Sequence, residues 1–559
     1  MPTKKWSQGL VSLGCVFGLV PTACVTPLAS VVENSSAIAS TVPKLMEQAL
    51  VPGLQTAVVE SGRINVLPFG VADVQSRRPV TEQTVFEAAS LGKPVLAYAV
   101  LKLATNGQID IDKPVGMYLE GLTGGFEKLT ARQLLSHTAG LPNKGSAAPL
   151  TSGDPRFSYS SEGINLLQRV VERISGQPLQ EYMGRAVFKP LQMTSSSFVW
   201  REDYVTRKAF GHGFTGASAG RNRISEAQAA SSLETTAEDY ARFMVAAVRG
   251  AGLKPELGGE MLRPQVTLED GCAVCLGQPR GKLSPHHWGL GFGLEKHGSR
   301  TYAWHWGDNE TMQSYAAADV SGDHGIVILT NSANGHSIAR QIASTVLGFD
   351  APGYAWVGSY APYTDPSRQL LSKVVRSGVA SVSSAEIGLP ASEVKQVAER
   401  LLAGGRPVDA AALMRRVISV GPARAGDYAV MAEALRRSDH IAEAIQAANT
   451  SLQLQADNAM AKEAIERIQQ SQRRIPASDL ARFAGRYDSP FGPLDVTSDG
   501  RRLVARLLDQ PPSEMLPLSN TQFLMTSMQV PIEFVADKNG VISHAVVHAG
   551  EEFKLPRLP

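Results

Sequence analysis

The pattern of apolar and polar positions divides this chain into parts with different periods. Residues 54–60 and 302–306 resemble strands, the latter by alternation. The run 94–103 is apolar nearly all round, which predicts a helix inside a core. Apolar residues at helical spacing from Ile164 to Ile174 stop at Gly176-Gln177-Pro178, which predicts a second helix. Further helices are expected at 130–136 and 337–347, and further strands at 315–320 and 325–330.

The pattern changes after residue 350. Residues 351–390 contain prolines and a serine-rich patch and are interpreted as a connector. Residues 391–472 are rich in Ala, Leu, Arg, Glu and Gln, and two similar helical stretches begin 33 residues apart, at Val408 and Ile441. This period resembles that of tetratricopeptide repeats, and a plain stack of helical hairpins is the alternative. Two repeats rarely stand alone, so this segment is expected to pack on a neighbour.

The last part, residues 476–559, returns to a β pattern. Asp499-Gly500 and Asn539-Gly540 are hairpin turns between apolar runs. We expect a small all-β domain without catalytic residues.

The N-terminus predicts export. Two lysines precede an apolar stretch from about Leu10 to Val25, followed by small residues, so residues 1–29 are interpreted as a signal peptide. A retained membrane anchor and lipid attachment at Cys24 are weaker alternatives. The expected location is therefore periplasmic or secreted, and no stable membrane span is expected after signal cleavage.

The amino-acid composition excludes few classes of protein, but it argues against a nucleic-acid-binding protein. The chain has 559 residues, is 43% hydrophobic and 19% charged, and carries a formal net charge of +2. These values are ordinary for a globular protein with a large core. The near-neutral balance gives no electrostatic reason to bind nucleic acid.

Beyond the leader only Cys272 and Cys275 remain. In an oxidising compartment this pair predicts a small disulfide or free thiols. A metal site with the nearby His286 and His287 is the alternative. We expect no metal and no cofactor.

Ser90-Leu91-Gly92-Lys93 carries the chemistry. Residues i and i+3 share a helix face, so the Lys93 amine is expected to lie over the Ser90 hydroxyl. Burial at the head of an apolar helix lowers the pKa of a lysine toward the neutral, proton-accepting amine. A serine beside such a base is an activated nucleophile.

This tetrad gains weight from three motifs downstream. They are residues 134–142 (LLSHTAGLP), Tyr159-Ser160-Ser161 and His305-Trp306-Gly307. In this order they resemble the penicillin-recognising serine hydrolases, namely class C β-lactamases, D-alanyl-D-alanine carboxypeptidases and related esterases. The resemblance covers about residues 40–350. It implies an α/β, β-lactamase/transpeptidase-like fold: an antiparallel sheet with flanking helices and a helical insertion.

The resemblance also implies roles. Ser90 is the expected nucleophile, and Lys93 and Tyr159 are expected to share base and acid work, with the tyrosine ionising below its usual pKa beside a lysine. The backbone N–H groups of Ser90 and Asp308 would form the oxyanion hole, with Gly307 allowing close approach. His305 would polarise the site or hold a substrate carboxylate.

Two positions depart from the family pattern. Ser161 stands where an asparagine is common, which weakens contact with a substrate amide. Trp306 stands where a threonine or serine hydroxyl usually helps to hold a carboxylate. Losing such a polar anchor typically costs about 1–3 kcal/mol. Both changes argue against an efficient β-lactamase and leave acyl transfer untouched.

Two other residues are set aside. Ser218 lies in a G-x-S-x-G sequence, but its glycine-rich flanks lack the buried strand that a nucleophile elbow needs. His137 is assigned to the fold, since the LLSHTAGLP turn is a structural hallmark of the family.

The sequence thus predicts an exported serine hydrolase acting on small substrates through an acyl-enzyme on Ser90. A D-amino-acid carboxypeptidase of peptidoglycan metabolism is the first expectation. A carboxylesterase, a β-lactamase, and a non-catalytic binding or scaffold protein are the alternatives. The helical repeats offer a surface for a protein partner.

Overall fold

The computed structural model describes residues 27–145, 147–149, 156–357 and 360–559. The predicted signal peptide and Cys24 lie outside these residues, except that residues 27–29 open helix α1 (Pro27–Ala49). Within the described ranges, no helix combines the length and apolar character needed to cross a bilayer.

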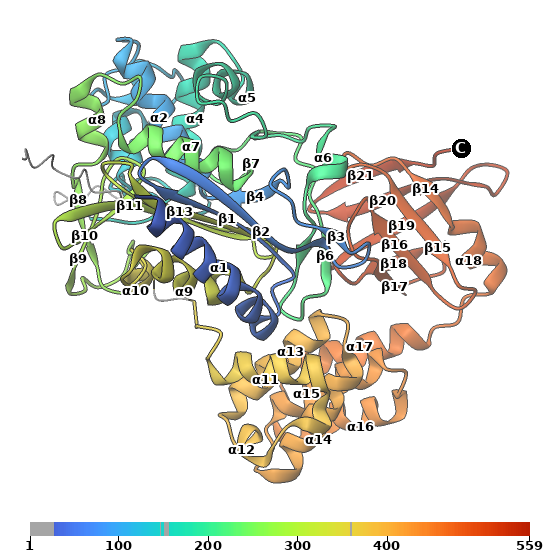
Figure 1. Cartoon of the computed structure of the whole chain (residues 1–559). Helices are drawn as coiled ribbons and strands as arrows, with labels where there is room; N and C mark the ends of the chain where they lie inside the picture. The colour runs from blue at the N-terminus through green and yellow to red at the C-terminus, as the bar shows by residue number, and fades with distance from the viewer. Residues whose placement is uncertain (1–26, 146, 150–155, 358–359) are drawn as a thin grey trace, which may run out of the picture.

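A nine-stranded antiparallel sheet forms the centre of the first part of the chain (Figure 1). The N-terminal hairpin pairs with the last strand of this part, so segments about 270 residues apart in sequence are neighbours in the sheet. In spatial order the strands are β3 (Arg78–Pro79), β2 (Arg63–Asp73), β1 (Gly53–Glu60), β13 (His324–Thr330), β12 (Gln313–Asp319), β11 (Arg300–Asp308), β10 (Gly293–His297), β9 (Leu283–Trp288) and β8 (Val266–Glu269).

Helices cover both faces of this sheet. On one face, α1 packs with α9 (Gly335–Leu347) and α10 (Tyr354–Val357). The other face carries the inserted helical region, whose core is built around the largely buried helix α2 (Gly92–Thr105). The remaining helices of this region are α3 (Ala131–Leu135), α4 (Ser161–Ser175), α5 (Leu179–Met183), α6 (Tyr204–Arg207), α7 (Ala237–Val248), α8 (Pro255–Met261) and the short turns η1 (Val115–Met117), η2 (Phe126–Lys128) and η3 (Gly184–Phe188).

Two small sheets complete this part. One pairs β4 (Phe86–Ala89) with β7 (Leu233–Thr235), and the other pairs β5 (Gly211–His212) with β6 (Ser218–Gly220). The fold class expected from the sequence is confirmed, as are the expected strands β1, β11, β12 and β13 and the helices α2, α4 and α9. The helix expected at 130–136 is the shorter α3, capped by Thr130 and Gln133.

From residue 366 to residue 472 the chain forms a succession of helices, which includes much of the predicted connector. α11 (Pro366–Ser377) shares a hydrophobic core with the helices that follow it. Those elements are η4 (Val379–Ser381), α12 (Ser384–Ile387), α13 (Ala391–Ala403), α14 (Pro407–Val420), α15 (Ala425–Arg437), α16 (Ile441–Leu454) and α17 (Ala459–Gln472). Their assignment as tetratricopeptide repeats stays a prediction.

The C-terminal part is an eight-stranded antiparallel barrel with sequential strand order. A bridge between Tyr487 and Arg557 closes it, and α18 (Ala477–Phe483) contributes Phe483 to its core. The strands are β14 (Gly485–Tyr487), β15 (Leu494–Ser498), β16 (Leu503–Leu507), β17 (Ser513–Pro517), β18 (Gln522–Met525), β19 (Val530–Ala536), β20 (Ile542–Ala549) and β21 (Glu551–Pro556).

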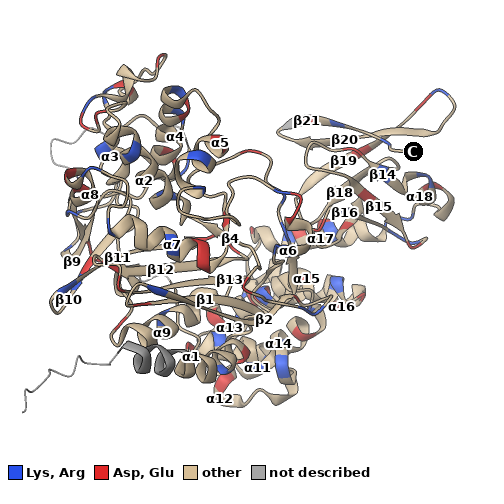
Figure 2. Ribbon diagram, turned by 45° about the horizontal axis from the view of Figure 1, so that its top comes forward, with Lys and Arg blue, Asp and Glu red and all other residues tan. Residues whose placement is uncertain are grey.

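Both C-terminal parts contact the first part and each other. Asp509 of the barrel pairs with Arg221 at 2.8 Å and with Arg223 at 3.2 Å, while Arg436 of α15 pairs with Glu514 of β17 at 3.3 Å. Acidic and basic side chains are interspersed over all three parts, which fits the near-zero net charge (Figure 2).

Candidate active site

The candidate nucleophile lies on a tight turn between β4 and α2. Ala89, just before Ser90, has a φ of 52°, a left-handed conformation that is uncommon for alanine. At Gly92 the backbone lies close to the carbonyl of Ala229. A Cβ at this position would lie 2.5 Å from that oxygen. This geometry starts α2 immediately after Ser90 and leaves the serine partly exposed.

Lys93 occupies the position predicted for the base. Its Nζ lies 2.9 Å from Ser90 Oγ and donates a hydrogen bond to the Ala230 carbonyl at 2.7 Å. The side chain is completely buried, and this burial lowers the pKa of Lys93 to about 7. At neutral pH a large fraction of the amine is therefore uncharged and able to accept the Ser90 proton.

Tyr159 lies beside this pair, with its ring centroid 4.8 Å from Lys93 Nζ. Its hydroxyl is buried and makes no well-formed hydrogen bond to any described residue. Burial raises the pKa of Tyr159 above its ordinary value, although the nearby Ser90 hydroxyl partly offsets the rise. The structure does not support the expectation that the phenol ionises easily, because burial raises the pKa of Tyr159 more than the Ser90 hydroxyl lowers it. Tyr159 remains a neutral O–H group.

The turn around His137 holds Tyr159 from one side. Ser158 N–H donates to the His137 carbonyl at 2.8 Å, and Ser160 N–H donates to His137 Nδ1 at 3.1 Å. The imidazole ring packs against the Tyr159 ring at 4.6 Å. Burial and the Lys93 charge lower the pKa of His137 well below its usual value, so it stays neutral. These contacts agree with the structural role expected for His137.

Ser161 is bound by a residue that sequence reasoning missed. Both its backbone N–H and its hydroxyl donate to Asn143 Oδ1, at 3.1 Å and 3.0 Å. Asn143 directly follows the LLSHTAGLP motif, and that position is the one signal in the sequence that could have indicated it. Ser161 is thus engaged within the protein, and an asparagine amide is present beside the motif after all.

His305 is buried and neutral. Its Nδ1–H donates to the Trp306 carbonyl at 2.7 Å, which leaves Nε2 as an acceptor without a partner among the described residues. Burial, reinforced by the Lys93 charge, lowers the pKa of His305 to about 3. A neutral ring whose free nitrogen is an acceptor cannot pair with a substrate carboxylate. The prediction that His305 holds a carboxylate is therefore not supported, whereas a role in shaping the polarity of the site stays open.

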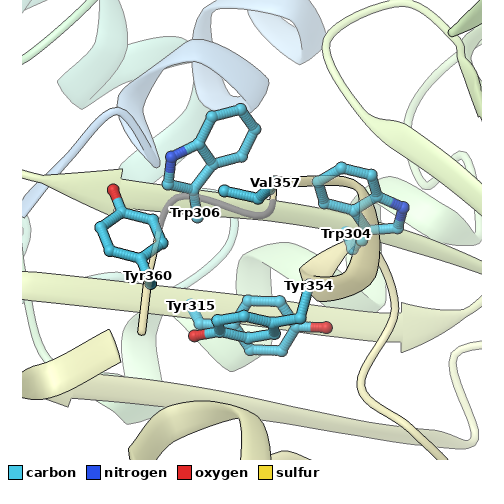
Figure 3. Close-up of a pocket in the computed structure, with 7 residues that line it drawn as sticks. Trp304, Trp306, Tyr315, Tyr354, Val357 and Tyr360 are labelled. Carbon is cyan, nitrogen blue, oxygen red and sulfur yellow. The ribbon is translucent and has the colours of Figure 1, made fainter. Parts of the chain in front are cut away.

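Trp306 packs into an aromatic cluster instead of projecting freely. Its ring lies 5.2 Å from that of Tyr159 and 6.1 Å from that of Trp356. A narrow pocket beside it leaves essentially no room for a water molecule (Figure 3). Trp304, Trp306, Tyr315, Gly353, Tyr354, Val357 and Tyr360 line this pocket. The Trp306 ring therefore supports the Tyr159 ring, and the pocket beside it offers no space for substrate.

Gly307 and Asp308 end β11 next to the nucleophile turn. A Cβ on Gly307 would lie 2.3 Å from the Ala88 carbonyl, so only glycine allows β11 to approach this turn. His336 fixes the same point through a 3.0 Å hydrogen bond to the Gly307 carbonyl. The Asp308 carboxylate is held by Gln313 at 3.0 Å and Tyr360 at 2.9 Å. The two backbone donors of the oxyanion hole stay a prediction, and this proximity is what they require.

A buried charge cluster underlies the nucleophile turn and was also missed. Lys208 lies between Glu87 of β4 and Glu234 of β7, and its Nζ is 2.8 Å from Glu87 Oε1. Asn309 donates to Glu87 Oε2 at 3.2 Å, which ties the end of β11 to the same group. Burial raises the pKa of Glu234 to about 7. No local sequence pattern links these residues.

The remaining candidates lie outside the site. Ser218 is in the three-residue strand β6, in a small hairpin with no nucleophile helix after it. Cys272 and Cys275 form a disulfide. His286 contacts Glu295 at 2.9 Å and His287 contacts Thr267 at 3.1 Å, and no group of three potential metal ligands occurs in the part of the chain that the structure describes.

The antiparallel sheet, and the partly exposed Ser90 beside the buried Lys93, can now be compared with known proteins. The family model described as Beta-lactamase matches residues 38–347, more than half of the chain. The chain belongs to this family.

Individual relatives match only part of the chain. A β-lactamase from Pseudomonas fluorescens is 30% identical over 169 residues, covering 27% of this chain and 47% of its own. Esterase EstB from Burkholderia gladioli is 32% identical over 169 residues, covering 24% and 43%. This chain thus spans less than half the length of these relatives. The crystal structure of D-alanine carboxypeptidase AmpC from Burkholderia cenocepacia has a TM-score of 0.49 and 20% identity, covering 57% of this chain and 99% of that one.

Proposed function

We propose that this protein hydrolyses small carboxylic esters through an acyl-enzyme on Ser90. The observation that carries the proposal is the buried Lys93 amine, 2.9 Å from Ser90 Oγ and with a pKa near 7. The same contact speaks against a decayed, non-catalytic site, because keeping an unpaired lysine buried is costly without a purpose for it.

The reaction divides into acylation and deacylation. Neutral Lys93 accepts the Ser90 proton while Oγ bonds to the ester carbonyl carbon, and the negative oxygen lies toward the backbone donors of Ser90 and Asp308. The neutral Tyr159 O–H suits protonation of the departing alkoxide, with the proton on Lys93 restoring the phenol. A water molecule then attacks the acyl-enzyme and loses its proton to neutral Lys93, which passes it to Ser90 Oγ as the carboxylic acid leaves.

Esters are preferred over D-amino-acid peptides because of the groups around the nucleophile. A carboxypeptidase of this family needs to hold a terminal carboxylate. His305 is neutral and Trp306 lacks a hydroxyl, so neither residue supplies a cation or hydroxyl for that purpose. An unmatched buried carboxylate costs about 1–3 kcal/mol, roughly a 10-fold to 100-fold loss. This consideration places the carboxylesterase ahead of the carboxypeptidase and the β-lactamase.

The test compares three substrate classes on purified protein. We expect p-nitrophenyl butyrate to be hydrolysed, and a D-alanyl-D-alanine peptide and a chromogenic cephalosporin to be turned over at least about 10-fold less efficiently. Ser90→Ala is expected to abolish ester hydrolysis. Ser218→Ala, at the serine of the other motif, is the matched control and should retain it.

Intact mass after incubation with a penicillin separates the alternatives. A lasting adduct that depends on Ser90, together with efficient peptide cleavage, would establish the carboxypeptidase instead. Rapid destruction of the drug without an adduct would establish a β-lactamase. Ester turnover that survives Ser90→Ala would show that the nucleophile is assigned wrongly.

A further inference from the structure

The backbone of Tyr159 is bound by the loop that the disulfide closes. Tyr159 N–H donates to the carbonyl of Ala273 at 2.8 Å, and Ala273 lies between the bonded cysteines Cys272 and Cys275. Just past the second cysteine, Leu276 N–H donates to Ser158 Oγ at 3.2 Å. Two consecutive residues of the tyrosine segment are therefore attached to the short disulfide loop.

A salt bridge attaches the same two segments a little further out. The Arg156 guanidinium binds the Glu269 carboxylate through two nitrogens, at 2.6 Å and 2.8 Å. It also donates to the carbonyls of Gln278 at 2.5 Å and Pro279 at 2.9 Å. This bidentate contact holds the Arg156 side of the segment to both ends of the loop.

These attachments matter because residues 156–160 form neither helix nor strand. On one side they are held by His137, as described above, and on the other by the disulfide loop. Removing the second set of contacts leaves the Tyr159 backbone held on the His137 side only. The Tyr159 hydroxyl has no hydrogen-bond partner of its own among the described residues, so backbone contacts and ring packing fix its position.

We propose that the Cys272–Cys275 disulfide is a positioning element for Tyr159, which makes proton delivery to the leaving group dependent on the redox state of this pair. The proposal rests on the function proposed above. A dithiol reductant would attack one sulfur, break the S–S bond and leave two thiols on the protein and a disulfide in the reagent. Cys272 is partly exposed, so such an attack is sterically open, whereas Cys275 is buried.

The expected consequence is selective. Loss of a general acid slows the departure of a poor leaving group much more than that of a good one, because p-nitrophenolate leaves without a proton. Reduced protein should therefore hydrolyse phenyl butyrate at least about 10-fold more slowly than oxidised protein, with a much smaller change for p-nitrophenyl butyrate. A merely structural loss would lower both rates by the same factor.

The experiment uses the full chain, assayed oxidised and after treatment with dithiothreitol followed by alkylation. Cys272→Ser/Cys275→Ser should reproduce the reduced pattern without reductant and should not respond to dithiothreitol. Tyr159→Phe defines the leaving-group pattern expected when the acid is lost. Intact mass before and after alkylation counts the thiols in each sample.

The outcomes separate the two proposals. Equal losses on both esters, no loss on either, or free thiols in the untreated active enzyme would each overturn the positioning role and leave the hydrolase assignment standing. Absence of any Ser90-dependent ester hydrolysis in the oxidised protein would instead overturn the proposed function, and the positioning role with it.

Discussion

At the scale of single residues, burial decides the chemistry more than proximity does. Lys93, Tyr159 and His305 lie in one desolvated cluster, and each is pushed toward its neutral form. Burial makes the Lys93 amine a base and keeps the Tyr159 hydroxyl protonated as an acid. It also keeps the His305 ring uncharged. The roles that were shared in the sequence-based mechanism therefore separate, with Lys93 suited to accepting protons and Tyr159 to donating them.

The pH dependence of hydrolysis should report the Lys93 amine. We expect kcat/KM for p-nitrophenyl butyrate to rise with pH through an apparent pKa near 7 and then to level off, since the protonated lysine cannot accept the Ser90 proton. A pH–rate profile from 5 to 9 measures this. A flat profile across that range would contradict Lys93 as the base.

The buried Lys93 amine, which favours catalysis, should lower the stability of the folded protein. Lys93 binds its proton less tightly in the folded state than its ordinary pKa of about 10.4 implies, so its burial costs stability below pH 7 and this cost fades as pH rises toward 10. Lys93→Met should therefore be inactive and melt higher than the wild type at pH 6, with the difference shrinking at pH 9. Thermal melts at both pH values test this, and a lower melting temperature at pH 6 would refute it.

The neutral His305 leads to a prediction about specificity. His305→Lys would place a longer cationic side chain where the family often has a lysine. We expect the ratio of kcat/KM for a carboxylate-bearing peptide to that for p-nitrophenyl butyrate to rise by about 10-fold, because a charge-assisted contact becomes available. His305→Gln is the matched polar, uncharged control and should not raise this ratio.

At the scale of elements, the nucleophile turn is shaped by close backbone approaches. A side chain on Gly307 would strike the Ala88 carbonyl of β4, and one on Gly92 of α2 would strike the Ala229 carbonyl. Below them, the Lys208 cluster ties β4 to β7. The serine is therefore placed by rigid elements, and its reactivity depends on contacts that lie beneath it.

Gly307→Ala tests the approach of β11. The new Cβ would lie 2.3 Å from the Ala88 carbonyl, so β11 has to move away from the turn. Because removing an oxyanion donor typically costs about 100-fold or more in kcat, we expect a kcat loss of this order with a smaller effect on KM. Gly259→Ala, in α8 where the new methyl group meets open space, is the control.

Lys208→Met tests the charge cluster. It leaves Glu87 and Glu234 buried without their cation, and breaking a buried ion pair in this way typically costs about 3–5 kcal/mol. Denaturant unfolding should show a loss of this order, whereas the exposed Lys128→Met should be nearly neutral. An unchanged unfolding free energy would mean that the cluster contributes no net stability.

At the scale of the whole molecule, contacts between residues close in sequence could be predicted, whereas contacts between separate segments could not. The Ser90–Lys93 contact, the buried α2 and the main strands were predictable because spacing within one element determines them. The Asn143–Ser161 contact, the Lys208 cluster and the binding of Tyr159 by the disulfide loop join distant segments. The direction of the Tyr159 pKa shift was missed for the same reason, because residues far away in sequence bury the Tyr159 side chain.

The three parts are joined by specific polar contacts. Gln510 and Asp509 of the barrel bind the segment around Arg221, which in turn reaches the Glu87 cluster through Asn222. The barrel thus contacts a segment that is itself hydrogen-bonded to the charge cluster beneath the nucleophile turn. A substitution in these contacts tests how firmly the barrel is attached.

Asp509→Ala should loosen this attachment. It leaves the buried Arg221 guanidinium without its carboxylate, and hydrogen bonds to charged groups contribute about 1.5–3 kcal/mol. We expect calorimetry to show a lower or a split unfolding transition. Asp495→Ala removes an exposed pair within the barrel and serves as the control. Identical thermograms for wild type and Asp509→Ala would mean that the barrel is held by other contacts.

The aromatic cluster around Trp306 also gives this protein an intrinsic fluorescent reporter. Four of the six tryptophans, Trp288, Trp304, Trp306 and Trp356, gather beside Tyr159, and none occurs after residue 356. Intrinsic tryptophan emission therefore comes mainly from the surroundings of the nucleophile, and the helical segment and the barrel contribute no tryptophan of their own. Acylation of Ser90 could be followed in real time without a label. Trp200 lies against Arg221 and Arg223, which bind Asp509 of the barrel, so it would report the loss of that contact.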